Sequence, residues 1–151
     1  MNSQSQPADM PSADNPRVRV AQCQCGGLSL RCEGAAERVS MCHCLACQRR
    51  TGSVFSANSR YLRERVTASG PATAYVRTAD TGNTVTAWFC PTCGSTVYWE
   101  LSGFPDVIAV AQGMFADPDY PAPTVEVWTQ SRHTWTDRIA DLPHPRFAQM
   151  P

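Results

Sequence analysis

Hydrophobic and polar positions alternate along this chain in short runs, and no long stretch repeats its apolar residues at the 3.6-residue period of an amphipathic helix. β-branched and aromatic residues dominate the runs, and glycine, proline and polar turn residues separate them. The sequence TADTGN predicts a hairpin turn, and we expect helix only as a turn or so after Cys47. Eight runs predict β-strands, at residues 17–23, 28–32, 53–62, 72–78, 84–90, 95–100, 106–112 and 124–130.

The length of 151 residues corresponds to about one domain. We therefore predict a single, mainly β, antiparallel domain over residues 18–142. Residues 1–17 are polar and rich in proline, serine, asparagine and glutamine, so we expect a disordered N-terminal tail. Residues 143–151 are expected to form a C-terminal tail.

Charge argues against several classes of partner. The 13 basic and 13 acidic residues give a net charge of zero without a basic run, which disfavours nucleic acid and anionic membranes. All the basic residues are arginine, so a lysine Schiff base is excluded. No stretch approaches the ~20 apolar residues of a membrane span, and the N-terminus lacks the apolar region of a secretory signal. We therefore expect a cytoplasmic protein; its oligomeric state is not predicted.

Eight cysteines need an explanation in a chain of this size. They permit a disulfide framework, with 105 possible pairings. In a reducing cytosol, however, clustered thiols are more often metal ligands or catalytic groups, and we favour metal. Seven of them form three clusters: Cys23 with Cys25, Cys42 with Cys44 and Cys47, and Cys90 with Cys93.

The Cys90-Pro-Thr-Cys93-Gly94 segment is the strongest local signal, because such a turn between two strands lets both sulfurs converge on one metal. A structural zinc requires four ligands, so a second pair must join it. Cys23 and Cys25, two residues apart on an extended segment, would point to the same side. We predict that these four cysteines close a structural zinc site.

The middle cluster then holds three ligands. Cys32 shares a strand face with the apolar Leu28 and Leu30, and we interpret it as a core residue. His43 lies between Cys42 and Cys44 and should point away from their sulfurs. Three protein ligands with one exchangeable position are the arrangement of a catalytic zinc.

Three thiolates on zinc carry a net charge near −1, and such a soft site suits a substrate thiol better than water. Arg49 and Arg50 follow Cys47 after one residue, Gln48, and can offset the added negative charge or bind substrate carboxylates. Ser53 or Thr51 is a further candidate for a hydrogen bond to the substrate. The alternative for the two arginines is a solvated surface pair.

Four segments together, CQCGGLSL, CHCLACQRRTGSVF, WFCPTCGSTVYW and PTVEVWTQSRHTW, resemble the glutathione-dependent formaldehyde-activating enzymes, also called S-(hydroxymethyl)glutathione synthases, whose domain occurs in centromere protein V. The resemblance covers roughly residues 18 to 142. It implies a β-tent zinc fold related in architecture to methionine-R-sulfoxide reductases, and two zinc ions per chain. The family's structural ligands fall on Cys23, Cys25, Cys90 and Cys93, and its catalytic ligands on Cys42, Cys44 and Cys47.

Three functions compete. The resemblance favours a carbon–sulfur lyase that adds a glutathione-like thiol to formaldehyde or a similar small electrophile. The alternative is a non-catalytic module with two closed zinc sites that binds a protein partner, with Cys32 or an external group as the missing ligand. A thiol-redox role for Cys90 and Cys93 is disfavoured, because strand-like residues flank them where a redox motif would open a helix.

The remaining aromatic and histidine side chains give weaker indications of a role in the site. For the tryptophans we expect core packing before ligand stacking. His133 is expected on the surface, with an acid or base role in the site as the alternative. The four tryptophans are Trp88, Trp99, Trp128 and Trp135.

Overall fold

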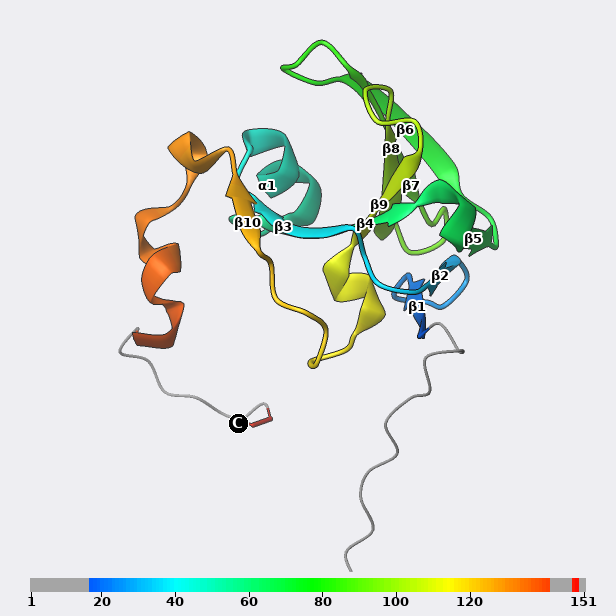
Figure 1. Ribbon diagram of the computed structural model, residues 1–151, viewed down its shortest axis with the longest axis horizontal. Coiled ribbons are helices and arrows are strands. Elements are labelled where there is room, and N and C mark those ends of the chain that lie inside the picture. Colours follow the sequence, from blue (N-terminus) through cyan, green and yellow to red (C-terminus); the bar gives the residue numbers. More distant parts are fainter. Residues whose placement is uncertain (1–16, 142–147, 150–151) are drawn as a thin grey trace, which may run out of the picture.

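The computed structural model describes residues 17–141 and 148–149, and in that part of the chain it contains ten strands and one α-helix (Figure 1). The strands are β1 (Val18–Gln22), β2 (Ser29–Glu33), β3 (Arg38–Cys42), β4 (Ser56–Leu62), β5 (Val66–Ser69), β6 (Thr73–Thr78), β7 (Thr84–Phe89), β8 (Thr96–Leu101), β9 (Val107–Ala111) and β10 (Val125–Val127). The helices are α1 (Leu45–Thr51) and the short 3₁₀ segments η1 (Arg63–Arg65), η2 (Gln112–Phe115), η3 (Thr129–Ser131) and η4 (Thr134–Asp141).

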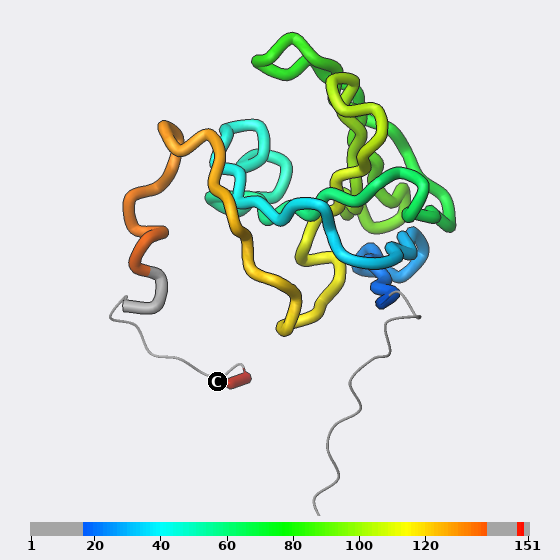
Figure 2. The backbone as a smooth tube through the Cα atoms, in the orientation of Figure 1, coloured from blue at the N-terminus to red at the C-terminus, as the bar shows by residue number. Residues whose placement is uncertain are grey.

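The strands form two sheets. The larger has seven strands in the order β10-β3-β4-β9-β8-β7-β6, and the smaller has the order β1-β2-β5. Every pairing is antiparallel except that of β10 with β3, which is parallel. The smaller sheet lies at one end of the molecule, and η3 lies at the other end beside α1 (Figure 2). The predicted mainly β, antiparallel fold class is confirmed.

Each of the eight predicted runs contains one strand, and the predicted turn at residues 79–83 joins β6 to β7. Two further strands, β3 and β5, were not predicted. Both are short, with five and four residues, and the alternation of polar and apolar residues in β3 covers only residues 38–41, the minimum length of a strand signal.

The predicted turn of helix after Cys47 is present, but the helix starts earlier than predicted. The helix α1 begins at Leu45, two residues before Cys47, because the Cys44 side chain accepts a hydrogen bond from the Cys47 amide and caps the helix. It ends at Gly52, whose φ of 68° is accessible to glycine at little cost.

The core consists of two groups of buried side chains. The first lies where the small sheet packs on the large one and includes Leu28, Leu30, Cys32 and Tyr61. Cys32 is completely buried there, as the alternation of β2 predicted. The second group covers one face of β7, β8 and β9: Val85, Ala87, Trp99, Ala109 and Ala111.

The four tryptophans differ in how deeply they are buried. Trp99 is buried, as predicted, and the indole Trp88 donates a hydrogen bond to the Glu100 carboxylate at 2.9 Å. For Trp128 and Trp135 the prediction of core packing was wrong, since 37% and 43% of their surface is exposed. Both lie after β10, the last strand of the described part of the chain.

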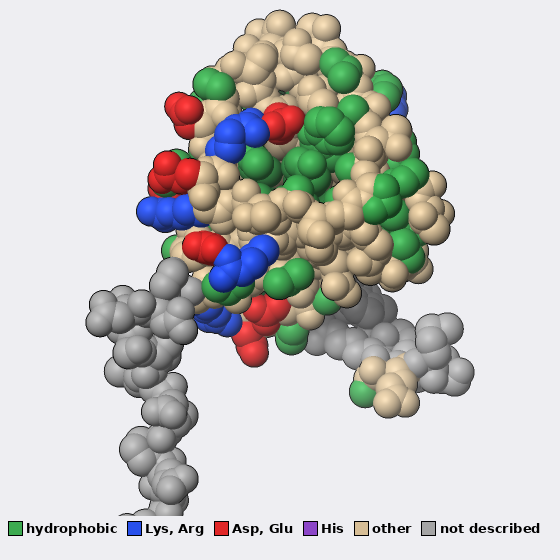
Figure 3. Space-filling model, turned by 90° about the vertical axis from the view of Figure 1, so that its right-hand side faces the viewer, with side chains coloured by type: hydrophobic (Ala, Val, Ile, Leu, Met, Phe, Trp, Pro, Cys, Tyr) green, Lys and Arg blue, Asp and Glu red, His purple; other side chains and the backbone are tan. Residues whose placement is uncertain are grey.

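Hydrophobic side chains also gather among polar ones on the face that carries the β6 end of the large sheet (Figure 3). Tyr75 and Val76, which point to opposite faces of β6, are 60% and 58% exposed. In the described part of the chain, no helix has the length and apolar character needed to cross a membrane. The predicted tails fall almost entirely outside the described residues, so the domain limits stay a prediction.

Candidate metal centres and the adjoining cavity

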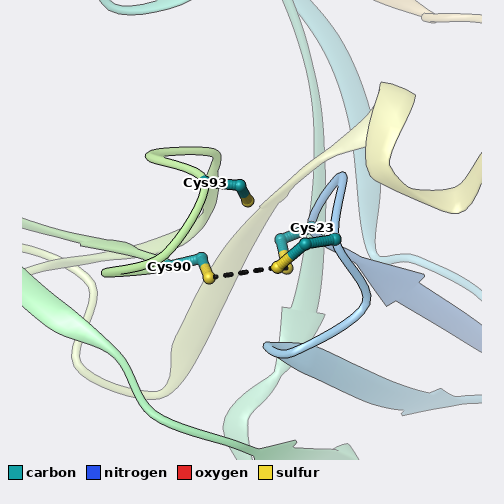
Figure 4. Close-up of side chains that lie close together, drawn as sticks. Cys23, Cys90 and Cys93 are labelled. Atoms are coloured by element: carbon teal, nitrogen blue, oxygen red, sulfur yellow. Dashed lines mark hydrogen bonds between the residues drawn. The ribbon is translucent and has the colours of Figure 1, made fainter.

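Two hairpin loops bring four cysteines together. Cys23 and Cys25 lie in the loop between β1 and β2, and Cys90 and Cys93 lie in the loop between β7 and β8. Figure 4 shows Cys90 and Cys93 pointing from one loop toward Cys23 on the other. All four sulfur atoms lie within 4.8 Å of one another.

The two loops close in the same way. The Cys90 amide donates to the Ser95 carbonyl at 3.0 Å, and the Cys23 amide donates to the Leu28 carbonyl at 2.9 Å. Each loop also contains a glycine with positive φ one residue after its second cysteine, Gly94 at 74° and Gly26 at 78°. Cys23 and Cys25 therefore lie on a tight turn. The prediction of an extended segment was wrong, and the turn supplies the convergence of the two sulfurs.

The geometry of this group fits a metal with four thiolate ligands. A tetrahedron with Zn–S bonds of ~2.3 Å has S···S edges of about 3.8 Å. The Cys23–Cys25 and Cys25–Cys90 sulfur pairs lie at 3.6 Å and 3.7 Å. Such spacing can hold a metal ion such as zinc without rearranging either loop.

Hydrogen bonds to the sulfurs favour the thiolate form that metals bind. The Leu28 amide donates to Cys23 Sγ at 3.2 Å and lowers the pKa of that thiol. The Ser95 hydroxyl lies 3.4 Å from Cys93 Sγ and lowers the pKa of Cys93 to about 5. Although a hydrogen bond with the Gly27 backbone lowers it, the neighbouring thiols raise the pKa of Cys25 to about 11. The spacing of the four sulfurs therefore fits a metal site, and the hydrogen bonds favour the thiolate at Cys23 and Cys93.

A second group forms where β3 meets α1. Cys42 is the last residue of β3, Cys44 caps the helix, and Cys47 lies in its first turn. Their three sulfurs also lie within 4.8 Å of one another. Unlike the first group, this one comes from a single stretch of six residues, so its geometry depends on the strand-to-helix turn alone.

Among the described residues, no further histidine, cysteine or carboxylate joins this group. Cys32 is in the core, on β2 of the other sheet. His43 is completely buried, and its Nε2 lies 3.5 Å from the Glu126 carboxylate. The group therefore offers three ligand atoms.

The three thiols differ in acidity. A hydrogen bond with Cys47 and burial raise the pKa of Cys42, and burial raises the pKa of Cys44. The pKa of Cys47 is lowered to about 5, first by the hydrogen bond from Cys42 and then by the positive charge of Arg50, against the opposing effect of burial. Cys47 is thus the thiol of this group that ionises most readily.

A cavity of about 640 Å³ lies between α1 and the β6–β8 end of the large sheet. Cys47 and the predicted residues Arg49 and Arg50 all line it, whereas Ser53 does not and is exposed on the following loop. The lining residues are Ala46, Cys47, Arg49, Arg50, Tyr75, Arg77, Val85, Ala87, Phe89, Gly94, Thr96 and Trp99.

Arg50 is held beside Cys47 by two contacts. Its guanidinium stacks over the ring of Trp99 at 4.1 Å. It also donates to the buried Ser56 hydroxyl at 2.6 Å, and that hydroxyl donates in turn to Asn58. Arg50 therefore has a fixed position in the lining of the cavity, which differs from the alternative of a solvated surface pair.

Sequence analysis missed the β6 contribution to this cavity. Tyr75 and Arg77 alternate on one face of β6, and their partners across the β6–β7 hairpin are Ala87 and Val85. The alternation was visible in the run ATAYVRT, but only the three-dimensional packing shows that this face meets α1.

His133 and Thr51 have roles outside the cavity. His133 is exposed, and its Nε2 lies 3.3 Å from the Gln48 side chain of α1. The same Gln48 amide donates to the carbonyls of His43 at 2.8 Å and Ser131 at 3.0 Å, which ties α1 to the segment after β10. The Thr51 hydroxyl donates to the Cys47 carbonyl at 2.9 Å and so stabilises the end of the helix.

The chain is similar to one protein family and to solved structures. The family model described as glutathione-dependent formaldehyde-activating enzyme matches residues 18–131. A search of curated proteins gives no match. Among solved structures, the crystal structure of a Rhodobacter sphaeroides protein from the Northeast Structural Genomics effort is similar, with a TM-score of 0.52 and 19% identity. The alignment covers 71% of this chain and 98% of that chain, and at this identity it shows a shared fold.

Proposed function

The chain belongs to the glutathione-dependent formaldehyde-activating enzyme family, and on that premise we propose that it joins the thiol of glutathione to formaldehyde. It would act as a carbon–sulfur lyase of the S-(hydroxymethyl)glutathione synthase type, at the group formed by Cys42, Cys44 and Cys47. One observation carries the assignment to this group: three ligand sulfurs lie together, and one of them, Cys47, lines a cavity that also contains Arg49 and Arg50.

Two zinc ions are part of this proposal. Cys23, Cys25, Cys90 and Cys93 would hold a structural ion, and Cys42, Cys44 and Cys47 would hold the catalytic one. Zinc bound by three thiolates supplies a thiophilic position that keeps a substrate thiol ionised near neutral pH. The hydrogen-bonded, closely spaced sulfurs described above support both sites.

The reaction is an addition that needs no oxidant or reductant. The substrate sulfur forms a bond to the carbonyl carbon, the π pair of the carbonyl moves to oxygen, and that oxygen gains the proton that the thiol loses. The cavity would hold the two reactants together, which removes much of the entropic barrier to their encounter. Arg50, fixed by Trp99 and Ser56, would offset the negative charge that the thiolate brings. Arg49 would bind a substrate carboxylate.

The non-catalytic alternative requires a fourth ligand at the second group. Cys32 was the candidate within the chain, and it lies in the core on a different sheet. No observation on the described residues favours this alternative over the enzyme.

Isothermal titration of the zinc-loaded protein with glutathione, beside cysteine and coenzyme A, tests the proposal. We expect glutathione to bind at millimolar concentration or better and more tightly than the other two thiols. Cys47→Ser should abolish glutathione binding and lose one zinc ion. Cys32→Ser, the matched control, should still bind glutathione and keep both zinc ions. Absence of any binding heat with glutathione would contradict the proposal.

A further inference from the structure

The cavity beside Cys47 has two facing walls that differ in origin. Arg49 and Arg50 come from α1, one turn or less after Cys47. Arg77 comes from β6, more than twenty residues later, and reaches the cavity because it shares a sheet face with its cross-strand partner Val85. Guanidinium groups thus line the cavity from both the helix and the sheet.

No carboxylate balances these charges within the lining. All twelve lining residues are neutral or basic. Among the residues that the structure describes, neither Arg49 nor Arg77 forms an ion pair. Arg77 makes one hydrogen bond, from Nη1 to the Thr78 carbonyl at 3.3 Å, which leaves most of its donors free.

The environment of Arg77 suits an anion. Val85 and Ala87 beside it are buried and apolar, so the sheet wall lowers the local polarity. A guanidinium in such a setting binds a carboxylate through two parallel hydrogen bonds, more strongly than it would in bulk water. The wall that carries Arg77 faces the helix that carries Cys47, so a ligand whose sulfur lies at Cys47 must extend across the cavity to meet Arg77.

We propose that Arg77 determines thiol specificity by binding a carboxylate of the substrate at the end remote from its sulfur. The cavity then selects extended thiols that carry two carboxylates, one for α1 and one for β6. A small thiol with one carboxylate next to the sulfur cannot use both walls. This inference rests on the proposed function, because it assumes that the sulfur lies at the Cys47 group.

The test uses the full zinc-loaded chain and two ligands, glutathione and S-methylglutathione. The second keeps both carboxylates but has no ionisable thiol, so it isolates the contribution of the arginines. Arg77→Gln should weaken the binding of both ligands about tenfold, the effect of losing one charge-assisted hydrogen-bonded pair. Arg77→Lys should recover part of that loss, because lysine keeps the charge without the two-pronged geometry.

Two controls accompany these variants. Arg31→Gln removes an exposed arginine of β2 that is paired with Glu33, and it should bind both ligands as the wild type does. The diethyl ester of glutathione, without either carboxylate, should bind weakly and equally to the wild type and to Arg77→Gln.

The outcomes separate the two proposals. Wild-type affinity of Arg77→Gln for glutathione would overturn the role of Arg77 and leave the proposed function intact. If both ligands depend on Arg77 but the wild type does not accelerate adduct formation from glutathione and formaldehyde, the proposed function fails and the role of Arg77 stands. If neither ligand binds the wild type, both proposals are wrong.

Discussion

The two cysteine groups gather their sulfurs within the same distance but from different parts of the chain. The four-cysteine group joins two hairpin loops that are 65 residues apart at Cys25 and Cys90, whereas the three-cysteine group lies within one turn between β3 and α1. A metal in the first group would link the small sheet to the large one. A metal in the second would link only residues that are already neighbours. On the proposed function, the first group would serve the fold and the second would serve the cavity.

The two groups also meet the cavity differently. Cys47 lines it directly, whereas the four-cysteine group lies next to it, since Gly94 of the β7–β8 loop and Thr96 at the start of β8 form part of the lining. The sulfurs of the four-cysteine group hold this loop against the β1–β2 loop. The first group therefore lies next to one wall of the cavity, and the second contributes Cys47 to the lining; in the proposed function Cys47 marks the reactive end.

The largest expected difference lies in folding stability. Cys90→Ser should lose one metal and several kcal/mol of unfolding free energy, since binding of a structural metal contributes directly to folding. Cys44→Ser should lose the other metal but at most about 1 kcal/mol, because serine also caps helices well. Metal analysis with denaturant unfolding of both variants checks this. Equal losses of stability would remove the distinction between the groups.

A smaller effect concerns the acidity of Cys47 in the metal-free protein. Its pKa of about 5 lies below the ordinary value of 9.0, so the thiolate persists at neutral pH and is lost only as the pH falls through about 5. Alkylation of Cys47 by iodoacetamide should thus be nearly constant from pH 8 to about 6 and slow below that. Arg50→Gln removes a positive charge and should move the midpoint to higher pH. An unchanged midpoint in this variant would show that Arg50 does not act on Cys47.

The smallest expected effect is that of Cys32→Ser on metal content. Cys32 is completely buried among apolar side chains of the core and belongs to neither group. The variant should keep both metals and lose about 1–3 kcal/mol, the cost of burying a hydroxyl in an apolar site. Loss of the second metal, measured by metal analysis of the purified variant, would instead favour the non-catalytic module with Cys32 as a ligand.

The cysteine groups illustrate what could be predicted from sequence. Spacing and the count of four ligands were enough to pair Cys23 and Cys25 with Cys90 and Cys93, and the structure brings these four sulfurs together. The backbone that achieves this was predicted wrongly for the first pair, because the strand ends at Gln22 and the backbone hydrogen bond from Cys23 to Leu28 closes a turn around Gly26. The alternation in β2 was enough to place Cys32 in the core.

The residues that line the cavity were harder to predict from the sequence. Arg49 and Arg50 follow Cys47 and could be proposed from their position alone. Arg77 and Trp99 lie on distant strands, and nothing local to them indicates that they face α1. The start of α1 was also missed, because a cysteine is not a usual helix cap and its role at Cys44 depends on the Cys47 amide.

Cobalt substitution tests the central claim most directly, since cobalt in thiolate sites reports a change of ligand in its absorption spectrum. In a protein with cobalt in both groups, glutathione should change the spectrum of one metal only, and Cys47→Ser should remove that change. A spectrum that glutathione leaves unaltered, or a change that survives in Cys47→Ser, would contradict the account of an accessible three-cysteine site beside a closed four-cysteine one.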